Sequence, residues 1–320
     1  MKRKREVKNF NLDPQAFLTN PKLMPRRASR AKGVNQKDLG EMMFSTTSSN
    51  RLSLSNLFLD QPIFLILSGP SLNLLDLNQI TSVGAMSFGV NNSWSIFKPS
   101  LWTCADHPNR FLYSRWRDPS VMKFCPLPLK NSKLRRKEGD KLVTVQESPG
   151  SCPNVFFYPR NLRFDPNTFL LQNSVNWGAE SKEKDALGHQ GARSVMFSAL
   201  RISYLLGFRN IYLCGADFKM EEGKQNYAFP QSRDLGAIKG NNSSYKTNSK
   251  RLKSLNEVLI NSGTRVWNCS PTSQLDAFPY LPFDQAIDNC RGLIPDQESS
   301  LGWYDKKKKK DKTKLAVKRN

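Results

Sequence analysis

The chain has 320 residues, 38% of them hydrophobic, and its 49 Lys and Arg side chains against 27 Asp and Glu give a formal net charge of +22. This length and apolar fraction are enough to form a buried core, which excludes a fully disordered chain. No stretch approaches the roughly 20 apolar residues that cross a bilayer, so we expect no membrane span. The charged residues 1–6 precede no apolar run, unlike a secretory signal, and we therefore expect a cytoplasmic protein.

The cysteines and histidines argue against a zinc or multi-histidine site. The six cysteines are far apart and form no Cys-x-x-Cys pair, so we predict that each is buried as a small hydrophobic side chain. The only histidines are His107 and His189. We expect no bound metal, apart from a carboxylate-bound Mg²⁺ under one alternative below.

The positive charge is concentrated at the two ends of the chain. Residues 1–33 carry ten Lys and Arg against two acidic residues, and residues 305–320 carry nine against two, which gives net charges of +8 and +7. Because self-repulsion opposes packing, we expect a basic flexible arm over 1–53 and a disordered basic tail over 291–320. A further basic run lies between Lys130 and Lys141. Such segments are typical of proteins that bind nucleic acid through its phosphates, and also of tails that only solubilise.

Between these ends, the segment 54–290 has the pattern of an α/β domain. The all-apolar run 62–67 predicts a strand buried on both faces of a parallel sheet. It is followed by the turn Ser68-Gly69-Pro70-Ser71-Leu72 and a polar helix start at 73–77. A buried strand, a glycine turn and a helix start are how an α/β nucleotide-binding unit begins.

The later elements alternate in the same way. We expect strands at 84–90 and 101–105, an irregular insertion or lid at about 126–185, and a helix at 194–207 that ends at Gly207. A strand at 210–214, a helix at about 250–262 and a strand at 265–267 follow. The sequence therefore predicts an open, mostly parallel Rossmann-like sheet flanked by helices, with an irregular insertion.

Small or polar residues follow each predicted strand. Ser68 and Gly69, Asn91 and Asn92, Asp106, Gly215 to Asp217, and Asn268 to Ser270 all hold such places. Ligands of open parallel sheets bind outside the carboxyl ends of the strands, so we expect these residues to converge on one pocket.

Taken in order, these segments resemble two related α/β families. The resemblance runs through Gly69-Pro70-Ser71-Leu72, Val90-Asn91-Asn92, Ala105-Asp106-His107-Pro108, Gly191-Ala-Arg-Ser194-Val195 and the stretch from Leu206 to Phe218. One family is the small bacterial sialyltransferases that act on lipooligosaccharide. The other is the MptE-like group, which includes 6-hydroxymethylpterin diphosphokinases. The similarity covers residues 62–280.

The sialyltransferase resemblance implies a set of donor contacts. Gly69, Pro70 and Ser71 would lie against the donor nucleotide, with backbone amides turned to its phosphate, and Asn91 and Asp106 would hydrogen-bond the base and ribose. Ser194 would stand near the transferred group, and the hydroxyl of Tyr227 would steady the leaving phosphate. The residues expected on the nucleotide side are Gly69, Pro70, Ser71, Asn91, Asn92, Asp106, Ser194, Lys219, Asn268 and Ser270.

Two positions depart from the sialyltransferase pattern. Lys219 follows Asp217-Phe218 where the family has a second tyrosine, and a cation there can still neutralise phosphate. The family's catalytic histidine has no counterpart at 245–249, where Asn248 cannot take a proton near neutral pH. We predict His189 as the general base, with Asp106 or Asp217 as alternatives, or an acceptor acidic enough to need none. Asp217 can also simply fix the loop after its strand, and 268–271 can be a plain turn.

Three functions are compatible with these residues. The first is a glycosyltransferase-like group transferase that uses a CMP- or UDP-linked donor and modifies bases of nucleic acid, as in viral DNA hypermodification within the host cytoplasm. The second is an Mg²⁺-dependent diphosphotransferase in which Asp106 and Asp217 bind the metal. The third is a non-catalytic nucleic-acid-binding protein that has kept the cleft.

Overall fold

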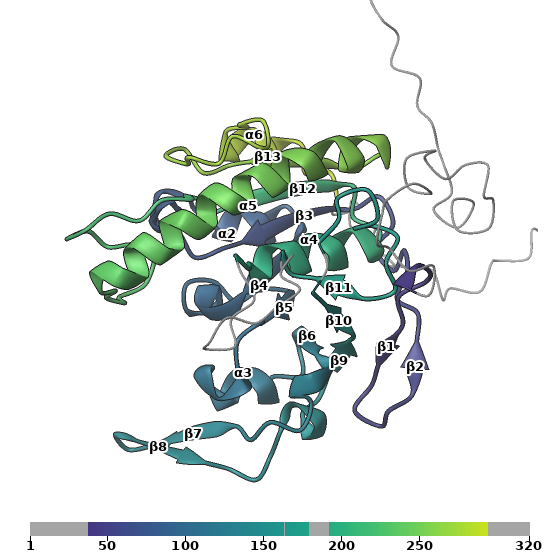
Figure 1. The fold of residues 1–320 in the computed structure, drawn as a ribbon, viewed down its shortest axis with the longest axis vertical. Coiled ribbons are helices and arrows are strands. Elements are labelled where there is room, and N and C mark those ends of the chain that lie inside the picture. The colour runs from purple at the N-terminus through teal and green to yellow at the C-terminus, as the bar shows by residue number, and fades with distance from the viewer. Residues whose placement is uncertain (1–37, 163, 179–191, 294–320) are drawn as a thin grey trace, which may run out of the picture.

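A computed structural model describes residues 38–162, 164–178 and 192–293. Its centre is a nine-stranded sheet, parallel from β13 to β9 and closed at one edge by the antiparallel β1 and β2. In spatial order its strands are β13 (Arg265–Asn268), β12 (Asn210–Cys214), β3 (Pro62–Ile66), β4 (Met86–Val90), β5 (Leu101–Thr103), β6 (Met122–Pro126), β9 (Val155–Tyr158), β1 (Phe44–Ser45) and β2 (Arg51–Leu52) (Figure 1). The predicted mostly parallel, Rossmann-like α/β fold is confirmed.

The chain reverses its direction of sheet growth at β3. From β3 the chain adds β4, β5, β6 and β9 on one side, and it then returns to add β12 and β13 on the other. All five residues of β3 are buried, as the all-apolar run predicts. The topological switch point, where α/β proteins bind ligands, therefore lies between the carboxyl ends of β3 and β12.

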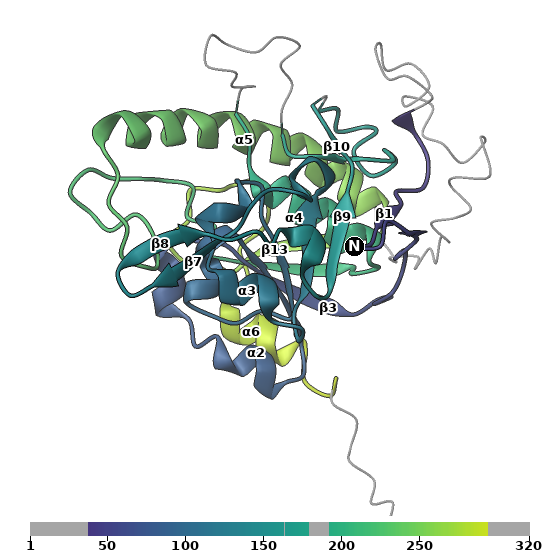
Figure 2. The same ribbon diagram turned by 90° about the horizontal axis from the view of Figure 1, so that it is seen from below.

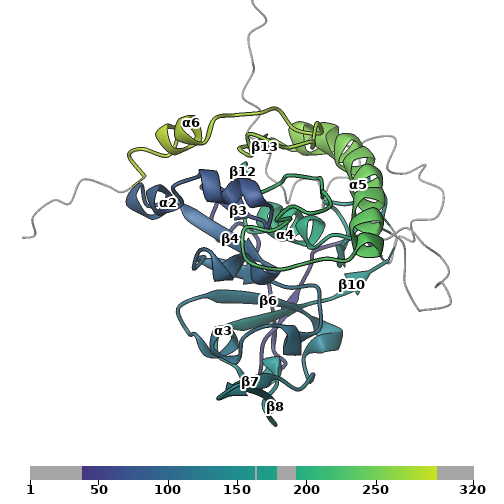
Figure 3. The same ribbon diagram turned by 90° about the vertical axis from the view of Figure 1, so that its left-hand side faces the viewer.

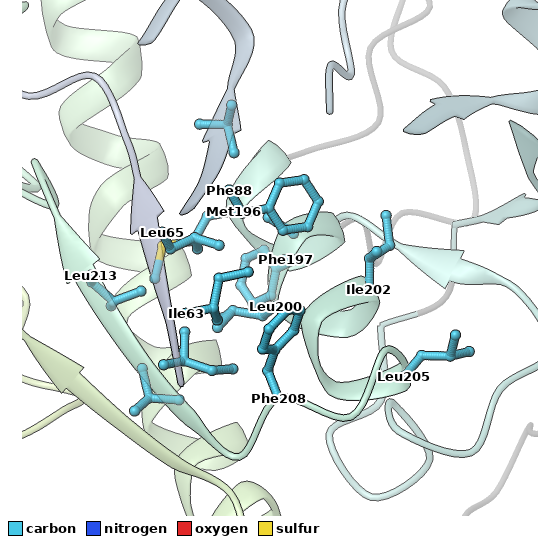
Figure 4. Packing of buried hydrophobic residues seen from close by; sticks show 14 of the residues in the cluster. Ile63, Leu65, Phe88, Met196, Phe197, Leu200, Ile202, Leu205, Phe208 and Leu213 are labelled. Carbon is cyan, nitrogen blue, oxygen red and sulfur yellow. The ribbon is translucent and has the colours of Figure 1, made fainter. Parts of the chain in front are cut away.

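Helices cover both faces of this sheet. Helices α4 (Val195–Leu205) and α5 (Leu235–Asn261) lie on one face, and α2 (Asn78–Ser82) and α6 (Phe283–Asp288) lie on the other (Figures 2 and 3). Alternate residues of β3 serve the two faces, since Ile63 and Leu65 pack with α4 while Phe64 packs with Phe283 of α6 (Figure 4). A third short helix is α3 (Tyr113–Arg117), and the 3-10 helices are η3 (Pro70–Leu74), η4 (Asn91–Ser95), η5 (Pro108–Arg110), η6 (Leu127–Leu129) and η7 (Pro149–Ser151).

The helix predicted at 194–207 is α4. The Ser194 side chain accepts a hydrogen bond from the Met196 amide at 3.2 Å, and Gly207 takes a φ of 102° just after the last turn. Most of its side chains are buried, which is the pattern of a helix enclosed by other elements.

Helix α5 is more than twice as long as its predicted range of 250–262. Its first half holds Gly236, Gly240 and a polar run, which are poor helix formers. Tertiary contacts compensate, because Asn242 accepts from the Met220 amide and donates to the Met220 carbonyl, both at 2.9 Å. The helix expected at 73–77 is instead the 3-10 helix η3 followed by the short α2.

Two predicted boundaries are wrong. The expected arm over 1–53 is too long, because residues 38–53 include β1 and β2, and Phe44 is fully buried beside Phe124. The expected insertion at 126–185 contains β9, an internal strand of the main sheet. What lies between β6 and β9 is the hairpin of β7 (Arg135–Glu138) and β8 (Lys141–Thr144), while the pair β10 (Arg160–Asn161) and β11 (Val175–Asn176) follows β9.

All six cysteines are buried and free, as predicted. None of the helices in the described ranges combines the length and the apolar character that crossing a membrane requires. The basic segments 1–37 and 294–320, which make up most of the two predicted tails, lie outside the described residues.

Candidate functional site

The loops after β3, β12 and β13 meet at the switch point and are joined by Asp217. One of its carboxylate oxygens accepts from the Ser71 hydroxyl at 2.7 Å and the Ser71 amide at 3.3 Å. The other accepts from the Thr272 hydroxyl at 3.1 Å. Asp217 is 3% exposed, so the predicted catalytic aspartate ties three loops together with both of its oxygens.

The glycine turn after β3 packs against this carboxylate. The Gly69 amide donates to the Gly215 carbonyl at 2.9 Å, and a Cβ added at Gly69 would lie 1.9 Å from an Asp217 carboxylate oxygen. Pro70 has no amide hydrogen, and the Ser71 amide is bonded to Asp217. The backbone amides of this turn are therefore not free to bind a phosphate as the resemblance implies, because they donate to the loop after β12.

Asn268 and Ser270 shape the loop after β13. The Ser270 hydroxyl accepts from the Ala216 amide at 2.8 Å, and the Asn268 side chain accepts from the Ser270 amide at 3.1 Å. Asn268 and Ser270 are 3% and 1% exposed, and these hydrogen bonds stabilise the loop from inside. A role toward a nucleotide stays a prediction for each.

The loop 225–231 runs across the glycine turn and carries Tyr227. The Ala228 amide donates to the Ser68 carbonyl at 3.0 Å, which places the loop over the end of β3. The hydroxyl of Tyr227 accepts from Arg233 Nε at 3.0 Å, and its ring stacks on Phe229 with centroids 5.4 Å apart. Tyr227 therefore stands beside the switch point, and its role toward a leaving phosphate stays a prediction.

A second tyrosine reaches the same place from α5. The ring of Tyr245 lies 5.1 Å from that of Phe218, in the loop after β12. Burial raises the pKa of Tyr245 to about 12, with the nearby Tyr227 and Asp217 acting in the same direction. Its hydroxyl is thus protonated at neutral pH and can donate a hydrogen bond. Lys219 follows Phe218 in the sequence, and the tyrosine that packs against Phe218 comes from α5 instead.

Other predicted residues lie apart from this cluster or serve as caps. Lys219 pairs with Glu221 at 3.7 Å. Ser194 caps α4, and Asn248 is buried on α5. His189, the predicted general base, lies outside the described residues.

The remaining predicted residues belong to the loops after β4 and β5. Asn91 has a φ of 48° and accepts from the Ala105 amide at 3.3 Å, which joins the two loops. The Asn92 side chain accepts from an Arg115 guanidinium nitrogen at 3.0 Å. Asp106 is exposed, 3.7 Å from Arg110. These residues do not contact the Asp217 cluster through any hydrogen bond recorded among the described residues.

Next to Asn92 the molecule is hollowed into a cavity of about 430 Å³. Its walls come from the loops after β4 and β5, the β7–β8 hairpin and residues 229–231. Four cationic side chains line it, and none of the described lining residues carries a carboxylate; the cations are Arg110, Arg115, Arg135 and Lys137. Phe229 belongs to the wall, so the stack of Phe229 on Tyr227 connects this cationic cavity to the switch point.

Arg115 is fixed in the wall of the cationic cavity. It is 7% exposed and donates to Asn92 and to the Ser95 hydroxyl, the latter at 2.7 Å, while its guanidinium lies 5.9 Å from the Trp94 ring centroid. All three partners are uncharged, so they orient the guanidinium without neutralising it. Burial lowers the pKa of Arg115 below its ordinary value, because the charged guanidinium is held away from water.

Within the described ranges, no group of three or more His, Cys, Asp and Glu side chains is arranged to hold a metal ion. Sequence reasoning missed Arg115, Arg233 and Tyr245 as members of the site. In the sequence these three residues belong to no motif and look like ordinary surface or core side chains. Only folding brings them to the carboxyl edge of the sheet.

No protein-family model and no curated protein sequence matches the chain. A solved structure to which the chain is similar is that of the MAf glycosyltransferase from Magnetospirillum magneticum AMB-1, with a TM-score of 0.39 and 14% sequence identity. The similarity covers 77% of this chain, which spans 36% of the length of that one. A likeness this distant carries no statement about activity, so a function for this chain rests on its own residues.

Proposed function

We propose that the protein is a glycosyltransferase-like group transferase that uses a nucleotide-activated donor, CMP- or UDP-linked, and modifies nucleic acid. The donor would lie along the carboxyl edge of the sheet, over the switch point. Its leaving phosphate would meet Tyr227 and Arg233. The activity requires no metal in this proposal.

The hydrogen bond from Arg233 to Tyr227 carries the proposal. Because the Tyr227 oxygen accepts from Arg233 Nε, its own proton points elsewhere and can be donated to an anion. Arg233 is exposed and has no carboxylate partner among the described residues, so its charge is available to the same anion. A hydroxyl and a cation aimed at one position stabilise the charge that develops on a departing phosphate.

The rest of the catalytic step would depend on positioning. Asp217 joins the loops after β3, β12 and β13; the loop of Tyr227 is bonded to the first of these through Ser68, and Tyr245 packs against Phe218 in the second. An edge that is preorganised in this way lowers the cost of bringing donor and acceptor together. Asp217 is poorly placed as the general base, since hydroxyl protons already occupy both of its oxygens. The base is then His189, Asp106 or none, if the acceptor is itself acidic.

The test compares a nucleotide with its nucleoside. We expect CMP or UDP, without Mg²⁺, to raise the melting temperature of the full chain, because a ligand that binds the folded state stabilises it. Cytidine and uridine lack the phosphate and should have a smaller effect. Tyr227→Phe and Arg233→Gln should each weaken nucleotide binding about tenfold or more, the value of a hydrogen bond to a charged group, and leave nucleoside binding unchanged.

Tyr204→Phe is the matched control, because it removes a tyrosine hydroxyl from α4 near the opposite end of the sheet. An unchanged nucleotide affinity in Tyr227→Phe would contradict the proposed site. Stabilisation by ATP only with Mg²⁺ would instead favour the diphosphotransferase, and stabilisation by DNA alone would favour a binding protein.

A further inference from the structure

The β7–β8 hairpin presents two different faces. Its strands pair Arg135 with Thr144, Arg136 with Val143, Lys137 with Leu142 and Glu138 with Lys141. Since side chains alternate along a strand, Arg135, Lys137 and Leu142 share one face, and Arg136 and Lys141 share the other. The first three line the cationic cavity, whereas Arg136 is bonded to Glu138 on the opposite face.

The cavity-side face continues the positive charge of the cavity wall outward. Arg135 and Lys137 are exposed and stand across from Arg110 and the buried Arg115. The nearest recorded acidic partners are weak surface ones, Asp106 at 3.7 Å from Arg110 and Asp140 at 4.0 Å from Lys137. Exposed pairs of this kind contribute little and are readily exchanged for another anion.

Apolar surface lies among these cations. Leu112 and Leu142, both in the cavity lining, are 52% and 63% exposed, and Phe229 completes the wall. Large exposed apolar side chains beside weakly paired cations fit a ligand that alternates anionic and flat apolar parts.

We propose that the cationic cavity and the cavity-side face of the β7–β8 hairpin bind single-stranded nucleic acid. Its phosphates would contact Arg110, Arg115, Arg135 and Lys137, and a base would lie against Leu142 and Phe229.

A strand suits this site better than a free phosphate or mononucleotide. Four cations spread over the connection between β5 and β6 and over the hairpin exceed what one phosphate contacts, while successive phosphates of a strand can meet them in turn. The hairpin also projects from the body of the protein (Figures 1 and 3). The identification of this strand as the acceptor rests on the proposed transferase function; the binding itself does not.

The experiment uses the two faces of the hairpin as test and control. A fluorescent oligothymidylate of about 12 nucleotides, within the usual range of single-strand sites, is titrated with the full-length protein at several salt concentrations. We expect Arg135→Gln with Lys137→Gln to weaken binding about tenfold and to reduce the slope of log affinity against log salt by about 1.4, for two lost phosphate contacts.

Arg136→Gln with Lys141→Gln removes the same charge from the opposite face. This variant should change the oligothymidylate affinity and the salt slope by less than half as much. Melting curves of both double variants check that the fold is retained. Equal losses in the two would overturn the proposal, because the strand would then respond only to total charge.

CMP serves as the second probe and separates this inference from the proposed function. If CMP binding depends on Arg135 and Lys137 as strongly as oligothymidylate binding does, the cavity is a donor site and the strand proposal is overturned. If CMP depends on Tyr227 and the strand depends on the hairpin face, both proposals are supported. If Tyr227→Phe leaves CMP binding unchanged while the hairpin variants still weaken oligothymidylate binding, the donor site is contradicted and the strand site is supported.

Discussion

Lys123 shows how a single residue can link stability to pH. Its side chain in β6 is fully buried, and its ammonium group donates to the backbone carbonyls of Asp118 and Val121 at 2.5 and 2.9 Å. Burial lowers the pKa of Lys123 to about 8, against a smaller opposite effect of the Asp118 carboxylate. The folded protein therefore releases this proton at lower pH than the unfolded chain does.

The sign of the pH dependence follows from the proton count. From about pH 8 toward the ordinary lysine value of 10.5, the unfolded chain binds more protons at this position, so the contribution of Lys123 to the free energy of unfolding rises with pH. The free energy of unfolding of Lys123→Met, minus that of the parent, should thus be highest near neutral pH. We expect this difference to fall by at most about 3 kcal/mol by pH 10.

Denaturant unfolding of the parent and of Lys123→Met across this pH range measures the difference, in which the titration of other groups cancels. Lys239→Met, at an exposed position of α5, should give a difference that does not vary with pH. A flat difference for Lys123→Met as well would mean that the buried amine keeps its ordinary pKa.

Helix α5 illustrates how an element with a weak local signal is stabilised at its ends. Its N-cap is Asp234, whose carboxylate accepts from the Ala237 amide at 2.7 Å. The glycines and polar residues of the following turns give the helix little intrinsic stability, so the cap and the contacts of Asn242 matter more than usual. The first half of α5 also carries Tyr245 to the site, which joins its stability to function.

Asp234→Ala should lower the free energy of unfolding by about 1 kcal/mol, because an orphan amide at the helix start loses its acceptor. Asp234→Asn keeps an acceptor and should cost less. Thermal unfolding measures both, and CMP affinity reports whether fraying of α5 displaces Tyr245. Equal stability of the parent and Asp234→Ala would show that tertiary contacts alone hold this end of the helix.

At the scale of the whole molecule, the N-terminal strands complete the core. Strand β1 pairs antiparallel with β9, so a segment from the start of the chain covers the edge of a sheet that is otherwise parallel. Met42 and Phe44 are fully buried, and the Phe44 ring lies 5.4 Å from that of Phe124 in β6. The segment that holds Met42, β1 and β2 is thus part of the folded unit.

Phe44→Ala should destabilise the protein by about 3 to 5 kcal/mol through lost burial and the cavity left beside Phe124. Leu57→Ala, at a position 52% exposed, should have almost no effect. Urea unfolding of both variants measures the difference. A small loss for Phe44→Ala would mean that β1 contributes little to the stability of the sheet.

The sequence by itself determined the central strands, because a run such as 62–66 is apolar on both faces and fits only the middle of a parallel sheet. It determined α4 for a similar reason, since its apolar period, serine cap and final glycine agree. It also placed polar residues at strand ends, of which Gly69, Asp217 and Ser270 meet at one edge, whereas Asn91, Asn92 and Asp106 have other partners.

Only the tertiary structure decided the rest. The pairing of β1 with β9, the first half of α5 and the packing of Tyr245 against Phe218 depend on contacts between segments far apart in the chain. Asp217 joins three loops through hydrogen bonds, and Gly69 packs directly against its carboxylate, because these loops lie close together only in the folded chain. The cationic cavity arises from four separate segments, and no local pattern encodes that arrangement, since charge in a sequence carries no information on what it will face.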